Sequence, residues 1–167
     1  MKYIVAAAGL AALFSGSAQA ATGSTSTATG TANATVVAPL QIAHTSGAAL
    51  NFGTFTAGTG GTVTVSSAGT GTVGGDVGFV NGNTNAADGF TVTGSGTRTF
   101  NITTSTGNTV STGGASPATM AFTVSTPASA SLVGGSYTLN IGGTLTVGSA
   151  QAAGAYTGSY TVTVTYQ

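Results

Sequence analysis

The chain has 167 residues, of which only two are basic and two acidic, and it contains 28 glycines and no cysteine. The charge count argues against nucleic acid as a partner, because binding to nucleic acid requires several Lys or Arg side chains that displace counterions. The lack of cysteine excludes a disulfide framework and a cysteine-ligated metal, so packing and backbone hydrogen bonds must hold the fold together.

The first twenty residues have the layout of a secretory signal peptide. Lys2 is followed by an apolar run from Ile4 to Phe14 and then by small residues that end at Ala20. The run is shorter than the ~20 residues that span a bilayer. We therefore expect residues 1–20 to be a cleaved leader. The protein would be exported through the inner membrane to the periplasm and then to the cell surface or the medium, and it would not span a membrane.

A segment of small residues follows the leader. Residues 21–33 contain no side chain larger than that of Thr or Asn and predict a flexible N-terminal arm. From Ala34 to Ile42 every even-numbered residue is apolar, and Pro39 falls on the opposite face. This pattern is typical of an edge or first strand, because proline cannot donate to a ladder. We expect a single domain that comprises residues 34–167.

Short alternating segments, each flanked by Gly, Ser or Asn, recur along the rest of the chain. Their spacing of roughly ten residues is typical of an antiparallel sandwich or barrel. No segment after the leader has helical periodicity, apart from a single turn around 128–130. The predicted fold class is all-β, an antiparallel β-sandwich of the immunoglobulin-like kind. Strands are expected at 50–55, 62–66, 76–80, 89–93, 98–103, 119–125 and 136–148, with a loop at 105–117 and a last strand at the C-terminus.

Two glycine-rich segments predict tight turns. Residues 94–96, Gly-Ser-Gly, are expected to join two strands as a three-residue hairpin. Residues 142–143, Gly-Gly, are expected to form a two-residue turn that divides 136–148 into two strands. In the first hairpin the inward side chains would be Phe90, Val92, Phe100 and Ile102.

The C-terminal stretch GAYTGSYTVTVTYQ has the most regular alternation in the chain. Tyrosines, valines and Gly158 occupy the even positions from Tyr156 to Tyr166, and threonines and Ser159 occupy the odd ones. A register slip of one residue would turn the aromatic face to water and bury the threonines. The register of this strand is therefore strongly specified.

Few side chains could carry chemistry. His44 stands at the end of its predicted strand, and a lone His without Cys, Glu or a second His is a poor metal site. Asp76 and Asp88 each lie beside glycine in turn-like sequence, where Asp usually bonds its own backbone. We interpret all three as structural and expect a protein that is not an enzyme, with no catalytic residue, metal or cofactor.

In four stretches the chain resembles the DUF4402 family of small secreted β-sandwich proteins of Gram-negative bacteria. The stretches are VVAPLQI…LNFGTF, GFTVTGSGTRTFNIT, LNIGGTLTVG and AGAYTGSYTVTVTY. The resemblance covers most of the chain after the leader. It implies a β-sandwich but little about function, because the role of the family is thinly described.

The ending also resembles that of chaperone–usher pilins, which typically carry a glycine fourteen residues from the C-terminus and a penultimate tyrosine. Gly154 and Tyr166 occupy these positions here. The resemblance implies a sandwich that lacks one strand, which the arm of the next subunit supplies, and it implies a periplasmic chaperone and an usher as partners. The assembly strand would comprise Gly154, Tyr156, Tyr160, Val162, Val164 and Tyr166, and the donor strand, drawn from about 28–38, would use Ala34, Val36 and Val37.

These patterns lead to two functional hypotheses. The first is a secreted structural subunit that associates with copies of itself into a surface filament or fimbria by donor-strand complementation. Near-zero net charge favours this hypothesis, because such a chain is poorly soluble unless it assembles. The second is a self-complemented surface or matrix β-sandwich, adhesin-like or carbohydrate-binding. Carbohydrate binding usually needs exposed aromatic rings, whereas the tyrosines here mostly share parity with valine and leucine.

Overall fold

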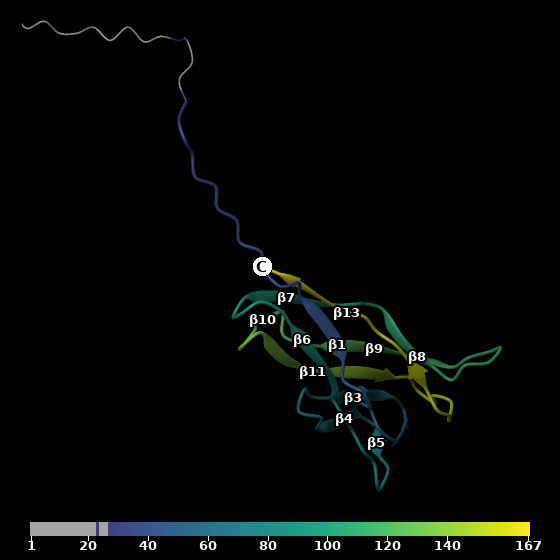
Figure 1. Ribbon diagram of the computed structural model, residues 1–167. Helices are drawn as coiled ribbons and strands as arrows, with labels where there is room; N and C mark the ends of the chain where they lie inside the picture. The colour runs from purple at the N-terminus through teal and green to yellow at the C-terminus, as the bar shows by residue number, and fades with distance from the viewer. Residues whose placement is uncertain (1–22, 24–26) are drawn as a thin grey trace, which may run out of the picture. The chain divides into compact units, whose positions relative to one another are not determined.

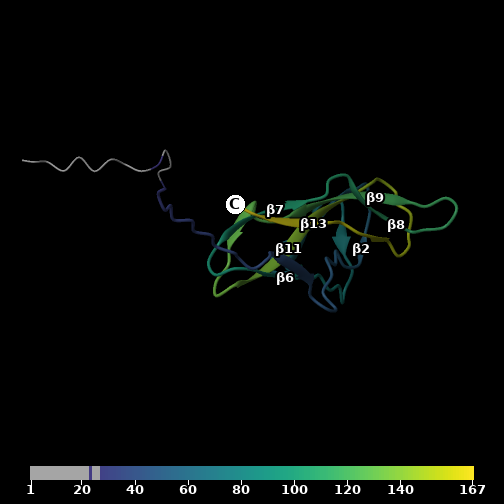
Figure 2. The ribbon, with the colours of Figure 1, turned by 45° about the horizontal axis from the view of Figure 1, so that its top comes forward.

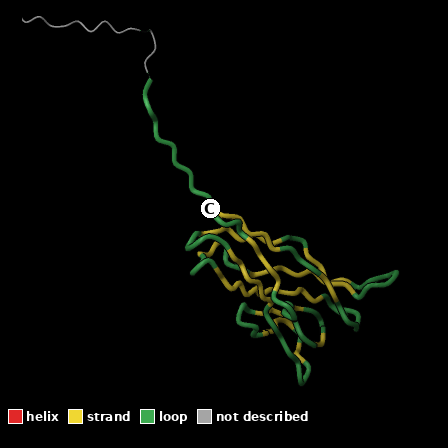
Figure 3. Tube along the Cα trace, viewed as in Figure 1, coloured by secondary structure: helices red, strands yellow, loops and turns green. Residues whose placement is uncertain are grey.

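The computed structural model describes Gly23 and residues 27–167, which form strands and loops and no helix (Figure 3). The predicted leader, residues 1–20, lies outside the described residues. The chain divides into two units, residues 1–35 and residues 36–167. In the first unit, residues 27–35 are exposed and form no strand. In the described part of the chain there is no helix of the length and hydropathy needed to cross a membrane.

The thirteen strands of the described residues all lie in the second unit and pair antiparallel (Figure 1), which confirms the predicted all-β fold class. One large sheet has the strand order β1 (Gln41–His44), β6 (Asp88–Thr93), β11 (Ser136–Val147), β9 (Thr119–Ser125), β8 (Asn108–Ser111) and β12 (Thr157–Gly158). Strand β11 also pairs with β3 (Gly61–Val65), and β3 pairs with β4 (Gly71–Gly75). A second sheet has the order β10 (Ser129–Ser131), β7 (Thr99–Thr104), β13 (Val162–Tyr166), and β2 (Phe55–Thr56) pairs with β5 (Gly78–Phe79).

Strand β11 is continuous, so the predicted turn at Gly142-Gly143 is wrong. Its first half pairs with β6, and its second half pairs with β9 and β3. The two glycines lie where the partners change. A Cβ on Gly142 would meet the Val65 carbonyl oxygen, and one on Gly143 would lie 2.6 Å from that of Thr123. Glycine is needed here for the close approach of neighbouring backbones, a use that the sequence does not distinguish from a turn.

The predicted hairpin across residues 94–96 is also wrong. Strand β6 pairs with β1 and β11, whereas β7 pairs with β10 and β13, so residues 94–98 cross from one sheet to the other. Alternation determines which face of a strand is buried but not which strand is its neighbour. The inward parity was predicted correctly, since Val92, Phe100 and Ile102 are buried and Phe90 packs against them.

The sandwich encloses two hydrophobic clusters. Val124 and Tyr160 pack against both of them. The first cluster, where β6 and β11 face β7 and β13 (Figure 2), consists of Val92, Phe100, Ile102, Leu132, Leu139 and Ile141. The second consists of Phe52, Val63, Val65, Val77, Met120, Phe122, Leu145 and Val147.

The C-terminal segment keeps the predicted parity but is not one strand. Strand β12 pairs with β8, and after residues 159–161 the chain continues as β13, which pairs with β7. From Tyr156 to Tyr166 the tyrosines and valines are half-buried and the odd-numbered residues are exposed. Pairing with both β7 and β8 requires a change of sheet that the alternation alone does not reveal.

The first strand begins later than predicted. Strand β1 starts at Gln41 rather than near Ala34, and Val36 is 97 % exposed. The predicted inward parity holds for Leu40 and Ile42, which pack against the first cluster. Pro39, which cannot donate to a ladder, lies just before the strand begins.

The hydroxyl of Tyr166 joins the last strand to the beginning of the domain. It accepts a hydrogen bond from the backbone N–H of Ser95 (2.7 Å) and donates one to the carbonyl oxygen of Ala38 (3.0 Å). Its ring packs against the first cluster. One side chain therefore closes this end of the sandwich.

We expect Tyr166→Phe to lower the free energy of unfolding by about 1 kcal/mol, because the ring stays and two hydrogen bonds are lost. Tyr166→Ser should cost about 2–4 kcal/mol, because the packing of the ring is lost as well. Thr165→Ser on the exposed face is the control and should change stability by less than about 0.5 kcal/mol. Urea unfolding measures all three, and equal losses for Tyr166→Ser and Thr165→Ser would contradict the parity.

Candidate functional site

The C-terminal segment forms an edge of the sandwich. Strand β13 pairs with β7 on one side and β12 pairs with β8 on one side, and among the described residues no strand pairs with the opposite side of either. Natural proteins commonly protect such edges with charged residues or proline. The assembly edge, residues 157–166, contains neither. It therefore remains able to accept a further strand.

An open groove of about 1250 Å³ lies beside the β12 end of this edge. Its walls are residues 48–57 and residues 151–160. Its remaining apolar lining includes Val110, Met120, Phe122 and Leu145, three of which belong to the second hydrophobic cluster. The three cluster residues are only 2–5 % exposed, so they form a buried floor of the groove at the place where the edge has no partner.

At one end of the groove, Asp88 accepts hydrogen bonds from three groups. The Tyr160 hydroxyl donates to Oδ2 (2.6 Å), and His44 Nε2 (2.7 Å) and the backbone N–H of Gly89 (2.8 Å) lie against Oδ1. Asp88 is 5 % exposed, and the His44 side chain is 48 % exposed. The carboxylate connects β1, β6 and the segment between β12 and β13.

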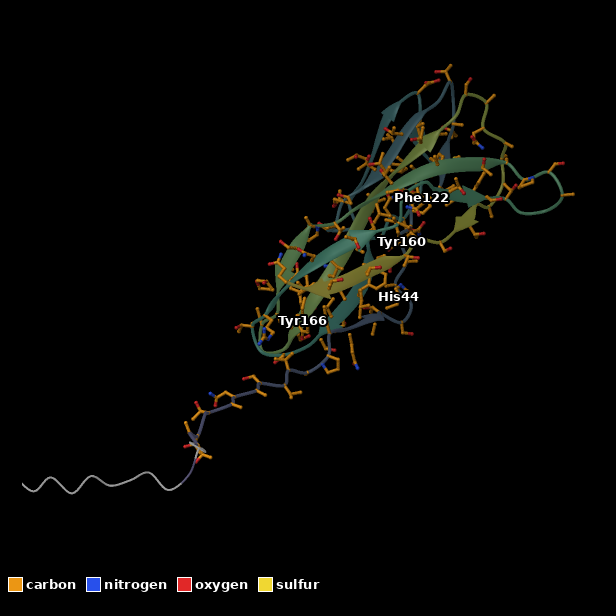
Figure 4. All side chains as sticks on the ribbon, turned by 90° about the horizontal axis from the view of Figure 1, so that it is seen from above. His44, Phe122, Tyr160 and Tyr166 are labelled. Carbon is orange, nitrogen blue, oxygen red and sulfur yellow. The ribbon has the colours of Figure 1, made fainter. Side chains whose placement is uncertain are left out.

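Tyr160 lies at the centre of this arrangement, between Phe122 and His44 (Figure 4). Its ring meets those of Phe90 and Phe122 edge to face, with centroids 6.3 and 6.2 Å apart. Burial raises the pKa of Tyr160, and the hydrogen bond to Asp88 and the charge of that carboxylate raise it further. The phenol therefore stays protonated and acts as a donor.

The remaining predicted assembly residues divide between the two clusters. Val162 and Val164 pack against the first and Tyr156 against the second. The Tyr156 hydroxyl donates to the Ala152 carbonyl (2.7 Å) and accepts from Gln151 Nε2 (2.9 Å). Gly154 is exposed. Of the predicted donor residues, Ala34 and Val36 are exposed and Val37 is half-buried.

The importance of Asp88 was missed in the sequence. Asp88 accepts from the adjacent backbone N–H of Gly89, as the turn interpretation predicts, whereas Asp76 accepts from the backbone N–H of Thr59 (2.8 Å), 17 residues earlier. However, Asp88 begins β6 and is buried. A signal was present, since Asp88 has the same parity as Phe90 and Val92 on the inward face. His44 lies at the end of its strand, as expected. No group of three or more His, Cys, Asp or Glu side chains in the described residues could hold a metal ion.

The fold and the groove define an antiparallel β-sandwich with an edge at β12 and β13 that lies beside an open groove. The chain belongs to the DUF4402 family, described as a domain of unknown function, whose model matches residues 40–166. The match begins just before β1 and ends at the last residue of β13, so it covers the sandwich without the arm. No curated protein and no solved structure matches the chain.

We expect Asp88→Ala to lower the free energy of unfolding by about 3 kcal/mol, because it leaves buried donors without an acceptor. Asp76→Ala is the matched control, since it removes an exposed carboxylate with one backbone partner and should cost about 1 kcal/mol or less. Urea unfolding of both variants near neutral pH measures the difference. Equal losses would show that the buried carboxylate has no special role.

Stability should also fall at alkaline pH through Tyr160. Below about pH 10 the phenol is protonated in both the folded and the unfolded chain. Above that pH the unfolded chain releases the proton while the folded chain keeps it, so the free energy of unfolding decreases as pH rises. Tyr160→Phe should make this decrease shallower. The measurement is urea unfolding between about pH 8 and about pH 11, and identical slopes for both proteins would refute the linkage.

Proposed function

We propose that this protein is a secreted, non-enzymatic structural subunit of a surface filament or fimbria, assembled by donating a strand from one copy to the next. The observation that carries the proposal is the assembly edge, residues 157–166, which lies beside an open groove in the core. An edge strand presents unpaired backbone groups, and an open groove exposes apolar side chains, so a strand added there would satisfy both.

The lack of charge supports association of the protein with itself. Once Lys2 is removed with the leader, only Arg98, Asp76 and Asp88 remain as charged residues, and none of them lies in the arm or in the assembly edge. Copies of the chain therefore do not repel one another, and a strand that enters the groove would bury no unpaired charge. Residues 27–35 are exposed and belong to no sheet, so they are available as a donor.

Export and assembly partners complete the proposal. The leader-like N-terminus supports passage through the inner membrane of a Gram-negative bacterium to the periplasm and then the cell surface. A subunit with an unfilled groove must be protected from aggregation before assembly. A periplasmic chaperone that lends a strand, and an usher that exchanges it for the next subunit, would meet this need.

A second candidate function is a self-complemented surface or matrix sandwich, adhesin-like or carbohydrate-binding. One observation favours it. The Tyr166 hydroxyl is bonded to the Ala38 carbonyl, and Leu40 and Ile42 pack against the first cluster, so the β13 end of the sandwich is closed by its own chain. On this view the groove at the β12 end would hold a ligand instead of a strand.

Deletion of residues 27–35 tests the filament proposal. The free energy of unfolding of the monomer should change by less than about 0.5 kcal/mol, because these residues are exposed and belong to no strand. Polymers should disappear in analytical ultracentrifugation and electron microscopy of surface material. The control is deletion of residues 21–26, which keeps the donor and should keep the polymer. Polymer from the 27–35 deletion, or a full-length protein that stays monomeric, would favour the second function.

A further inference from the structure

The exposed arm carries the residue pattern of a strand. Residues 27–36 read TATGTANATV, with small apolar residues or glycine at every even position before Val36 and Thr or Asn at every odd one. Strict alternation is the pattern of a strand with one buried face. Yet residues 27–35 form no strand and are exposed. The pattern therefore indicates a segment that becomes a strand when it pairs with an edge.

The assembly edge complements this segment in length and in side-chain size. Both consist of ten residues. The inward face of the edge carries large side chains from Tyr160 to Tyr166 and a glycine at Gly158. The apolar face of the arm carries Ala or Gly everywhere except at Val36. A large residue on one strand can thus face a small residue on the other along the whole length.

The shape of the groove determines the direction of the added strand. At the β13 end Leu40 and Ile42 pack against the first cluster and the Tyr166 hydroxyl is bonded to the Ala38 carbonyl, so this end is filled by residues of the domain itself. At the β12 end the groove is open. Val36, the largest residue of the arm, must therefore lie near Gly158. This placement requires the arm to run antiparallel to β12 and β13.

The register follows from parity. In an antiparallel pair, residues directly opposite each other point to the same face, so an even residue of the arm must face an even residue of the edge. We propose that residues 27–36 of one copy add antiparallel to β12 and β13 of a second copy, with Val36 opposite Gly158; this inference rests on the proposed function. The other inward pairs are Ala34 with Tyr160, Ala32 with Val162, Gly30 with Val164 and Ala28 with Tyr166.

The chain geometry favours a second copy for this register. Within one domain the Ala38 carbonyl is bonded to the Tyr166 hydroxyl, and the Cα of Val36 is at most about 7 Å from that of Ala38. Gly158 lies eight residues before Tyr166, roughly 25 Å away along an extended chain. Figure 4 shows the corresponding separation between Tyr166 and Tyr160. Val36 is therefore held near the Tyr166 end of the edge in its own domain, whereas Gly158 lies near the other end.

Cysteine cross-linking tests the register, because the chain has no cysteine of its own. Thr35 and Ser159 are outward-facing neighbours in the proposed pair, as are Thr29 and Thr165, and all four are exposed. Opposite residues of an antiparallel pair have Cα atoms about 4.5–5.5 Å apart, within the range of a disulfide. Full chains that carry T35C, T29C, S159C or T165C, with a size tag on one partner, are mixed in pairs and oxidised.

We expect disulfide-linked heterodimers from the two matched pairs, T35C with S159C and T29C with T165C. The mismatched pairs are T35C with T165C and T29C with S159C, and the yield of heterodimer from the matched pairs should be at least about tenfold higher. A parallel strand would reverse this preference and overturn the inference. A chain that carries both substitutions of a matched pair tests pairing within one copy. If disulfides form only within such a chain and not between copies, the inference is overturned. If normal polymers form without the expected cross-links, the proposed register is wrong but the proposed function stands. If neither the variants nor the unmodified chain associates, both the register and the proposed function are wrong.

Discussion

Both hydrophobic clusters depend on the single strand β11. Leu139 and Ile141 from its first half belong to one cluster, and Leu145 and Val147 from its second half belong to the other. Between them, Gly142-Gly143 lets the neighbouring backbones approach closely enough for the strand to change partners without breaking. Because the chain has no disulfide and almost no charge, the two halves of the sandwich are held together by packing, and this shared strand contributes to both clusters.

The buried carboxylate of Asp88 has a similar linking role near the groove. It is bonded to Tyr160 at the point where the chain passes from β12 to β13, and Tyr160 packs against both clusters. A buried charge is tolerated only when it is well hydrogen-bonded, and the three donors around Asp88 provide this. The site therefore fixes the position of the assembly edge relative to the core.

The proposed assembly explains two features that appear unfavourable in an isolated subunit. An uncharged edge without proline invites association, and an open groove lies directly over core side chains. Both features are what strand addition requires, and the arm offers a matching segment of small alternating residues. The arm has no large apolar residue to anchor it, but its small residues suit an edge whose own inward side chains are large.

The sequence by itself determined the all-β fold class, the inward parity of residues such as Val92, Phe100 and Tyr160, and the membership of the family, because a period of two residues is a local property of the chain. It did not determine every strand, since β8 lies in the predicted loop at 105–117 and β10 lies at the predicted turn around 128–130. Only the tertiary structure decided which strands pair. It placed β6 and β7 in different sheets, kept β11 continuous through two glycines, split the C-terminal segment between β12 and β13, and buried Asp88 against Tyr160. The physical reason is that alternation specifies which face of a strand is buried, whereas strand pairing depends on which distant edges fit together. The sequence also does not distinguish a glycine needed for a turn from one needed for a close backbone contact.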